Sequence, residues 1–361
     1  MKLQFQRESA LATFSLAAMV APTRSPKEIL QYVKIEVRNG AAVIMATDLE
    51  VGIRVAMEGI ETEEEHLDLV LPVDRFSLIL RENKDEKLAL DVKENIVTIK
   101  GQHSKFQLPS PDPDEYPSII DFAESDYIEI ERPVFHEMIR RTVFATDTDS
   151  TRYALGGVLL EHTDDHLLAV ATDGRRLAKM DGASKIVGAP NKGGGMTIVP
   201  TRAMQLLERA LGDAEGQVLI APRSNDVLIR CDNVVFYSRL VEGRFPKWQE
   251  VLPDRRGANR IDITIGPLYS ALRQASIVSS QDSRGIDLEF QEGSLVLSAS
   301  TAEKGESRVE VPISYDGPTV AVTLDHRYVS DFLRVVRGAC VVHHRKLRLR
   351  RDASFPRQIT D

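Results

Sequence analysis

The chain has 361 residues and a formal net charge of −8 at pH 7, and 42% of its residues are hydrophobic and 28% charged, a composition that excludes a disordered chain. No apolar run approaches the roughly 18 residues of a membrane span, the N-terminal MKLQFQRES lacks the apolar core of a secretory signal, and two cysteines are too few for a disulfide framework, so we expect a cytoplasmic protein. The net acidic charge by itself disfavours nucleic acid, although an electric field depends on where the charges lie.

The predicted elements follow one another in an order that recurs three times. Apolar residues at helical spacing predict a helix within 5–22, period-2 alternation predicts strands within 40–57, and a second amphipathic helix follows at 70–83 before further strands in 91–119. The same order returns as helix 135–150, strands 156–174, helix 198–211 and strands 221–248, and then as helix 268–283, strands 285–301 and helix 322–336.

This threefold recurrence predicts the fold class and the domains. We expect an α+β protein of three similar domains, 1–127, 128–255 and 256–361, each an antiparallel sheet with two helices on one face. The third copy departs from the pattern from about residue 338, because no clean pair of alternating strands follows its second helix. Its RKLRLRR stretch could form one basic edge strand or a disordered tail.

The stretch ATDGRRLA (171–178) predicts a tight turn between two strands. Asp-Gly between alternating apolar runs is a strong hairpin signal, because glycine accepts a positive φ and aspartate tolerates it. On that signal alone plain structure is the first interpretation, and a binding surface is the alternative.

Motifs for catalysis are absent from the sequence. It contains no GxxxxGK[ST], HExxH or CxxC motif, and His162 and His166 fall at a predicted turn, where a solvated hairpin tip is the simpler interpretation. A carboxylate cluster of Asp147, Asp149 and Asp173 leaves a repeat-built, metal-dependent hydrolase as an alternative function, but no nucleophile accompanies these residues. We therefore expect no catalytic residue, no metal and no cofactor.

Basic residues recur on the predicted helices, whereas the acidic runs ETEEEH and DPDE fall in loops. A solvated helix face explains any single pair, but recurrence in three copies favours a common basic surface suited to phosphate contacts without sequence readout. These residues are Arg75, Arg140, Arg141, Arg202, Arg209, Arg273, Arg327, Arg334 and Arg337.

In its threefold repeat and in the turn at 171–178, the chain resembles the bacterial DNA polymerase III β sliding clamps, over roughly residues 1–337. The most specific match is TRYALGGVLLE (151–161) followed by ATDGRRLA, and LVEGRFPKWQEVLP (240–253) is similar to the segment that closes the family's second domain. The resemblance implies a non-catalytic processivity factor, a homodimeric ring of six similar domains that encircles double-stranded DNA. It implies DNA-facing residues on the inner helices: Arg24, Arg75, Arg140, Arg141, Arg202, Arg209, Arg273 and Arg327.

The resemblance also implies two protein-binding surfaces. The first is a pocket for short peptides of the polymerase III core, the clamp loader, other polymerases and repair proteins, formed by Arg152, Leu155, Thr172, Gly174, Arg175, Arg176, Leu177, Pro246, Val251 and Tyr328. The second is the dimer interface, where Phe106 and Leu108 on an edge strand would meet Ile277 and Val278 at a helix end. Ordinary core packing is the alternative for these four.

Three departures from the family pattern affect the predicted partners. Arg175 stands where a histidine is common, and Glu250 stands where the family often has arginine. The end of the chain does not match the apolar segment that completes the family's peptide pocket. A further alternative function is a monomeric peptide-binding module that never contacts DNA, which would keep the Leu177 socket without the arginine pattern.

Overall fold

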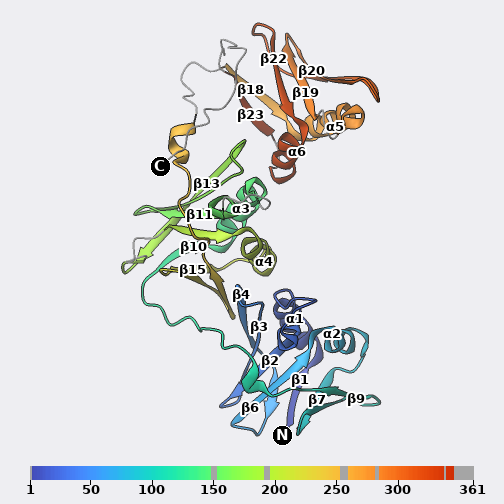
Figure 1. The fold of residues 1–361 in the computed structure, drawn as a ribbon, viewed down its shortest axis with the longest axis vertical. Helices are drawn as coiled ribbons and strands as arrows, with labels where there is room; N and C mark the ends of the chain where they lie inside the picture. Colours follow the sequence, from blue (N-terminus) through green and yellow to red (C-terminus); the bar gives the residue numbers. More distant parts are fainter. Residues whose placement is uncertain are drawn as a thin grey trace. The chain divides into compact units, whose positions relative to one another are not determined.

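The computed structural model describes residues 2–147, 153–190, 196–252, 259–280, 284–336 and 339–344, and a strand that runs directly into a helix begins each of three repeats (Figure 1). These pairs are β1 (Lys2–Gln6) with α1 (Arg7–Ala18), β10 (Tyr127–Glu131) with α3 (Arg132–Thr142), and β18 (Asn259–Thr264) with α5 (Ile265–Ala275). The second helix of each repeat also follows a strand: β6 (His66–Pro72) with α2 (Val73–Glu82), β14 (Thr197–Pro200) with α4 (Thr201–Leu211), and β22 (Val320–Asp325) with α6 (His326–Val335).

The remaining strands fall between the two helices of a repeat or after the second one. Between the helices lie β2 (Tyr32–Arg38), β3 (Ala41–Thr47), β4 (Val51–Met57) and β5 (Ile60–Thr62), then β11 (Gly157–His162), β12 (His166–Thr172) and β13 (Leu177–Val187), then β19 (Gly285–Gln291), β20 (Ser294–Thr301) and β21 (Gly305–Pro312). After the second helix come β7 (Lys87–Lys93), β8 (Ile96–Lys100) and β9 (Lys105–Pro109), then β15 (Gln217–Pro222), β16 (Asp226–Cys231) and β17 (Val234–Arg239), then β23 (Ala339–His344).

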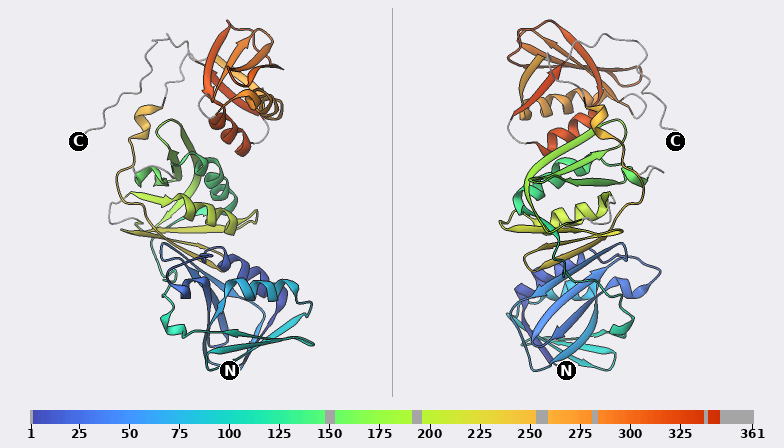
Figure 2. Two further views of the ribbon diagram at one scale, coloured as in Figure 1. Left: turned by 45° about the vertical axis from the view of Figure 1, so that its right-hand side comes forward. Right: turned by 90° about the vertical axis from the view of Figure 1, so that its left-hand side faces the viewer.

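The helices form where apolar residues share one face. In α4, Ala203, Leu207 and Leu211 recur every four residues and are all buried, which is the stripe that packs a helix onto a sheet. Asp325 accepts a hydrogen bond from the backbone N–H of Arg327 and so caps α6. The two helices of each repeat pack beside one another (Figure 2). None of the described helices is long and apolar enough to cross a membrane.

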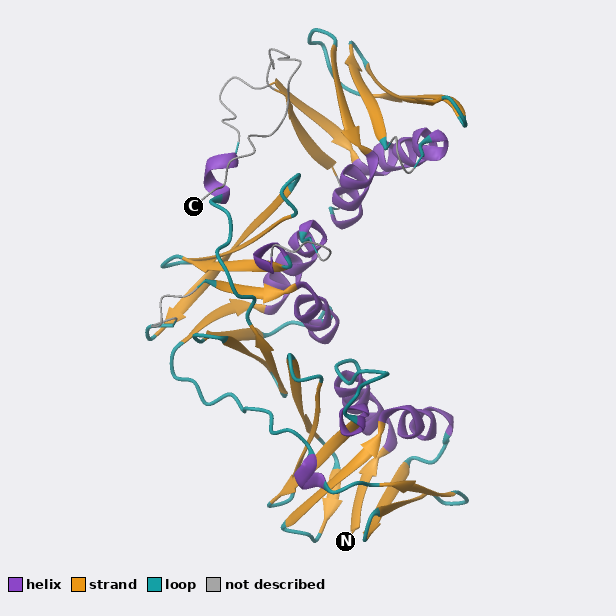
Figure 3. Ribbon diagram, in the orientation of Figure 1, coloured by secondary structure: helices purple, strands orange, loops and turns teal. Residues whose placement is uncertain are grey.

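All strand pairings between described residues are antiparallel, and within each repeat the helices cover one side of the strands (Figure 3). The sheet orders are β5-β1-β7-β8-β9, then β14-β11-β12-β13-β10-β15-β16-β17-β4-β3-β2-β6, then β18-β23, and β21-β20-β19-β22. The predicted α+β class with antiparallel sheets is confirmed.

The long sheet joins the first two repeats. The joining pair is β17 of the second repeat with β4 of the first, and it sets Phe236 opposite Ile53. Both side chains are buried, and they belong to one core that contains residues of both repeats. We call this pairing the internal seam. A separate core lies in the third repeat, in agreement with the division of the chain into two compact units, Met1–Pro246 and Lys247–Asp361.

The segment between β9 and β10 reinforces the internal seam. Tyr116 is buried and donates its hydroxyl to the backbone oxygen of Tyr32 in the first repeat, and burial raises the pKa of Tyr116. Phe122, six residues on, packs against apolar side chains of the second repeat, and the guanidinium of Arg230 lies 4.8 Å from the centre of its ring. One segment thus holds both repeats.

The end of the third repeat is partly regular. The sequence predicts no clean pair of strands there, and the residues described after α6 form one strand, β23, which pairs with β18. This pairing repeats β1 with β7 and β10 with β15, so the third repeat follows the same topology up to His344. The predicted edge strand or tail at 345–361 lies outside the described residues.

Candidate partner-binding and DNA-facing surfaces

The predicted Asp-Gly turn joins β12 to β13, and its own side chains hold it. The Asp173 carboxylate accepts hydrogen bonds from the backbone N–H groups of Arg175 and Arg176, at 2.8 and 2.9 Å. The Thr172 hydroxyl donates to the Arg176 oxygen and accepts from the Gly174 N–H, at 2.6 and 3.0 Å. Gly174 has a φ of +81° with open space where a Cβ would stand, so conformation and not crowding requires glycine.

The Arg176 side chain ties this turn to the end of the preceding helix. Its Nε lies 3.0 Å from Asp173 Oδ2, it donates to the backbone oxygen of Phe144 at 2.6 Å, and its guanidinium lies 5.3 Å from the centre of the Phe144 ring. The Arg176 guanidinium therefore stabilises the position of the turn against Phe144. Arg175, by contrast, has an exposed side chain.

The predicted pocket residues differ in exposure. Leu155 is buried, Thr172 is buried within the turn, Leu177 and Pro246 are half-buried, and Val251 is 61% exposed. Tyr328 is half-buried on α6, beneath the Arg327 guanidinium. Arg152 lies outside the described residues. Five of the predicted pocket residues lie at the same β12–β13 turn: Thr172, Gly174, Arg175, Arg176 and Leu177.

The first repeat contains a second turn with the same hydrogen bonds. Asp48 accepts from the N–H groups of Glu50 and Val51, and Thr47 donates to the Val51 oxygen and accepts from the Leu49 N–H. This turn contacts the neighbouring repeat, because the Asp48 carboxylate lies 2.9 Å from the guanidinium of Arg202. The same local structure thus already forms one docking surface inside the chain.

Five of the predicted DNA-facing arginines form ion pairs. Arg140 and Arg141 both bind Glu137, each at 2.6 Å. Partial burial favours the neutral acid, but the two guanidinium groups outweigh it and hold the pKa of Glu137 below its ordinary value. The other pairs are Arg75 with Asp74, Arg202 with Asp48, and Arg327 with Asp325.

Arg24, Arg209 and Arg273 have exposed side chains, and they form no ion pair with another described residue. Arg209 and Arg273 stand in the last turns of α4 and α5, where a cation is favoured by the helix dipole. The guanidinium groups of these three residues are therefore accessible to solvent.

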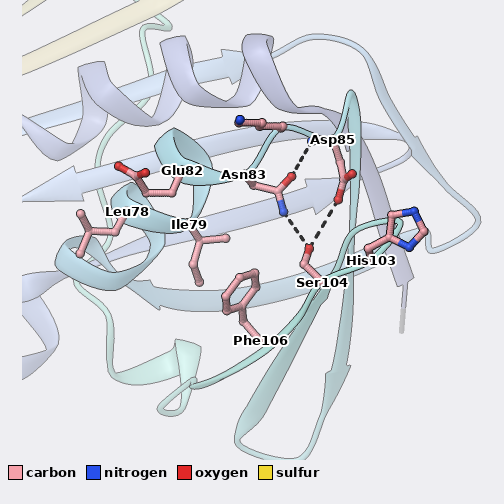
Figure 4. Close-up of a pocket in the computed structure, with 9 residues that line it drawn as sticks. Leu78, Ile79, Glu82, Asn83, Asp85, His103, Ser104 and Phe106 are labelled. Atoms are coloured by element: carbon pink, nitrogen blue, oxygen red, sulfur yellow. Dashed lines mark hydrogen bonds between the residues drawn. The ribbon is translucent and has the colours of Figure 1, made fainter.

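A groove lies between α2 and the edge strand β9 (Figure 4). It has a volume of about 450 Å³, and Leu78 and Phe106 on its walls are 49% and 38% exposed. Asn83 Nδ2 donates to Ser104 Oγ at 2.7 Å, and the Asp85 N–H donates to Asn83 Oδ1 at 2.6 Å, so hydrogen bonds fix the rim. An apolar groove beside an open strand edge is suited to bind protein.

The predicted dimer residues differ in exposure: two pack against a core and two are exposed. Leu108 is half-buried and packs against the core of the first unit. At the end of α5, Val278 packs against the core of the third repeat, whereas Ile277 is 74% exposed. Core packing therefore accounts for Leu108 and Val278 but not for Phe106 and Ile277.

The two described residues of the alternative hydrolase, Asp147 and Asp173, take part in structural hydrogen bonds. Asp173 is taken up by the turn, the Asp147 N–H donates to the Leu155 oxygen, and Asp149 lies outside the described residues. His162 ends β11 and His166 begins β12, and the hydrogen bond from His166 Nδ1 to Asp165 raises the pKa of His166. This is a hairpin tip.

Comparison with known proteins decides the family. Three sequence models match, the N-terminal, central and C-terminal domains of the DNA polymerase III beta subunit, at residues 1–120, 129–247 and 249–343. The chain belongs to the DNA polymerase III beta subunits, the bacterial sliding clamps. The beta sliding clamp of Pseudomonas putida is 29% identical over 341 residues, which are 93% of this chain and 90% of the relative, and that of Chlamydia pneumoniae is 26% identical over 316 residues, 87% and 84%.

Solved structures agree with this assignment to the sliding clamps. The DNA polymerase III subunit beta of Pseudomonas aeruginosa bound to griselimycin matches with a TM-score of 0.87 at 27% identity, over 95% of this chain and 92% of that one. The same protein in another crystal structure matches with a TM-score of 0.84. The predicted family and the function as a DNA sliding clamp are confirmed, and the hydrolase has no support.

Sequence reasoning missed two features of this sliding clamp. The groove residue Leu78 is an exposed leucine on an amphipathic helix, and this outward position was the available signal. The pair of Asp48 and Arg202 had a weaker signal, the recurrence of Ala-Thr-Asp at 46–48, 145–147 and 171–173.

Proposed function

We propose that the chain forms a homodimer that closes into a ring of six clamp domains around double-stranded DNA. The three domains of each copy would be 1–127, 128–255 and 256–361. The main support is the internal seam. In this head-to-tail contact, β17, the last strand of the second repeat, pairs with β4 of the first repeat. Head-to-tail contacts that close under symmetry give rings and not filaments.

The two strands at the ends of this arrangement support a second copy as partner. β9 ends one sheet and β21 ends another, and β9 stands at the position in the first repeat that β17 holds in the second. An unpaired edge invites pairing with another chain. The exposed Phe106 and Ile277 would cover one another there.

The arginines support DNA inside the ring. A tether that works by topology needs only weak phosphate contacts, which carry no sequence information and allow sliding. We propose that Arg24, Arg209 and Arg273 make most of them and that the ion-paired arginines contribute less. We propose that this clamp acts in the cytoplasm. It works as a tether and not as an enzyme.

The Asp-Gly turn supports a peptide-binding surface for polymerases, the clamp loader and repair proteins. It offers a rigid backbone next to the half-buried Leu177, and we propose that Pro246, also half-buried, joins Leu177 in anchoring one or two apolar side chains of a peptide. Such small anchors give modest affinity, which suits the exchange of partners. Griselimycin bound to the similar clamp of Pseudomonas aeruginosa is consistent with a ligand site on this fold.

Sedimentation and DNA retention test the proposal together. Equilibrium sedimentation should give twice the mass of the chain, and Ile277→Asp should give the single mass, whereas Ile120→Asp, another exposed isoleucine, should not. After incubation with a bacterial clamp loader and ATP, the dimer should stay on nicked circular DNA and leave linear DNA. Equal retention on both DNAs would exclude a ring.

A further inference from the structure

A cleft lies beside the internal seam, where the first two repeats meet within one compact unit. One wall is helix α1 of the first repeat, and the other is α4 with the turn between β16 and β17 of the second repeat. An inner chamber of about 90 Å³ and an outer chamber of about 300 Å³ share Asp232 and Asn233 of that turn as lining. We call this space the seam cleft. Ligands bind preferentially at such contacts between structural units.

Helix α1 presents a single face to both chambers. Ser9, Thr13 and Leu16 follow one another along this helix at spacings of four and three residues, which places them on one face. Ser9 and Thr13 line the outer chamber, whereas Leu16 lines the inner one. The lining of the seam cleft therefore changes from polar to apolar along the helix.

The inner chamber is apolar, and the charged groups beside it are paired. Leu207 and Phe236 line it and are buried. Burial also raises the pKa of the Cys231 thiol, which stays uncharged at neutral pH. The Arg132 guanidinium donates from Nε to the last backbone oxygen of α4 and lies near Asp232 Oδ2, both at 2.7 Å. An apolar cavity of about 150 Å³ accommodates benzene, so this chamber suits a branched alkyl group of about four carbons.

The outer chamber contains two polar side chains that have no partner within the described part of the chain. Thr13 is 7% exposed, and its hydroxyl forms no hydrogen bond with another described residue. The exposed Glu58 carboxylate forms no ion pair with the described residues. By contrast, the Ser9 hydroxyl donates to the Glu58 backbone oxygen at 3.2 Å, and the Asn233 amide donates to the Ala56 oxygen at 2.9 Å. A ligand that bonds to the Thr13 hydroxyl would remove the cost of burying it unpaired.

The charges around the outer chamber favour a cation. Arg132 neutralises Asp232, so Glu58 leaves one uncompensated negative charge among the described lining residues. An ammonium group carries a positive charge and three hydrogen-bond donors. It can therefore pair with the Glu58 carboxylate and donate to the Thr13 hydroxyl, whereas the carboxylate would repel an anion.

We propose that the seam cleft binds a small branched aliphatic amine, with its alkyl group in the inner chamber and its ammonium group between Thr13 and Glu58. Both repeats contribute walls, so the amine binds only while they are paired and thereby stabilises the internal seam. None of the described residues that line the cleft belongs to the predicted peptide pocket, DNA-facing set or dimer interface. The site is therefore distinct from the surfaces of the proposed function.

Ligand-observed NMR on the full-length chain tests this site. The probe is isoamylamine, and isoamyl alcohol is the uncharged control with the same alkyl group. Saturation transfer from the protein should be strongest at the methyl groups of the amine, because they enter the inner chamber. The dissociation constant should be millimolar, since so small a ligand makes few contacts, and the midpoint of thermal unfolding should rise with amine concentration.

Substitutions locate the bound amine. Glu58→Gln should weaken the binding of isoamylamine about two- to fivefold, the effect of losing an exposed ion pair, and should leave isoamyl alcohol unaffected. Glu63→Gln, at another exposed glutamate, should change neither. Thr13→Val keeps the shape of the side chain without its hydroxyl and should also weaken the binding of the amine. Ala210→Leu adds volume in the inner chamber and should abolish the binding of both probes.

Each outcome supports or overturns the site. Absence of saturation transfer to the amine would overturn it, and so would an amine affinity that neither Glu58→Gln nor Thr13→Val lowers. Full binding to a folded Ala210→Leu variant would place the amine elsewhere. If that variant unfolds, the comparison of Glu58→Gln with Glu63→Gln still decides. The proposed ring is unaffected by any of these results, because the measurements require neither a second copy nor DNA.

Discussion

The guanidinium of Arg202 lies 2.9 Å from the carboxylate of Asp48, and the two residues belong to different repeats. This ion pair gives each residue a structural role that the sequence did not indicate. Arg202 is engaged in a contact between the first two repeats, and the Ala-Thr-Asp turn of the first repeat provides the other side of that contact.

The two partners should contribute unequally to stability. Arg202→Ala removes one ion pair whose arginine side is exposed, worth about 0.2–1 kcal/mol. Asp48→Ala should cost about 1–3 kcal/mol, because two backbone N–H groups lose their acceptor. Urea denaturation of both variants measures the difference, and an equal loss would contradict the assigned role of the turn.

The exposed arginines should dominate DNA retention. Arg209→Glu with Arg273→Glu should shorten the lifetime on nicked circular DNA and flatten its salt dependence, because fewer phosphate charges are neutralised. Arg140→Ala is the matched control, since its guanidinium is held by Glu137. Retention that falls more in this control would reverse the ranking of the arginines.

Leu177 should anchor partner peptides. Leu177→Ala should weaken the binding of a labelled clamp-binding peptide by about tenfold, the effect of losing roughly 1.4 kcal/mol of apolar contact, without dissociating the dimer. Fluorescence anisotropy measures the affinity. Leu49→Ala in the equivalent turn of the first repeat is the control, and an unchanged affinity for the Leu177 variant would exclude the socket.

Two glycine substitutions should have opposite effects. Gly174→Ala should lower the free energy of unfolding by about 1 kcal/mol, because an L-residue is strained at a φ of +81°. Gly266→Ala in α5 has open space at its Cβ and no positive φ, so it should raise stability by about 0.4–1 kcal/mol. Thermal unfolding compares them, and a stabilising Gly174→Ala would contradict the turn geometry.

Acid should remove the contribution of Glu137. Its pKa in the folded protein lies below the ordinary value, so its stabilisation is complete above that value of about 4.3 and is lost as the pH falls through the folded pKa. Glu137→Gln does not titrate. The difference in unfolding free energy between wild type and this variant should therefore shrink in urea titrations from neutral to acidic pH, and a constant difference would refute the pairing.

Much of this protein could be predicted from the sequence by itself, because its signals are local. Apolar periodicity indicated the paired helices, and Asp173-Gly174 indicated the turn, since both depend on neighbours a few residues apart. The recurrence of those signals predicted three similar domains.

Only the tertiary structure decided which side chains are engaged and which are exposed. It paired Arg202 with Asp48 and left Arg209 exposed, although both are arginines on one helix. It buried Phe236 and exposed Phe106 at corresponding positions, because only Phe236 lies against another repeat of the same chain. Such differences arise from contacts between segments far apart in the sequence, and no local pattern encodes them.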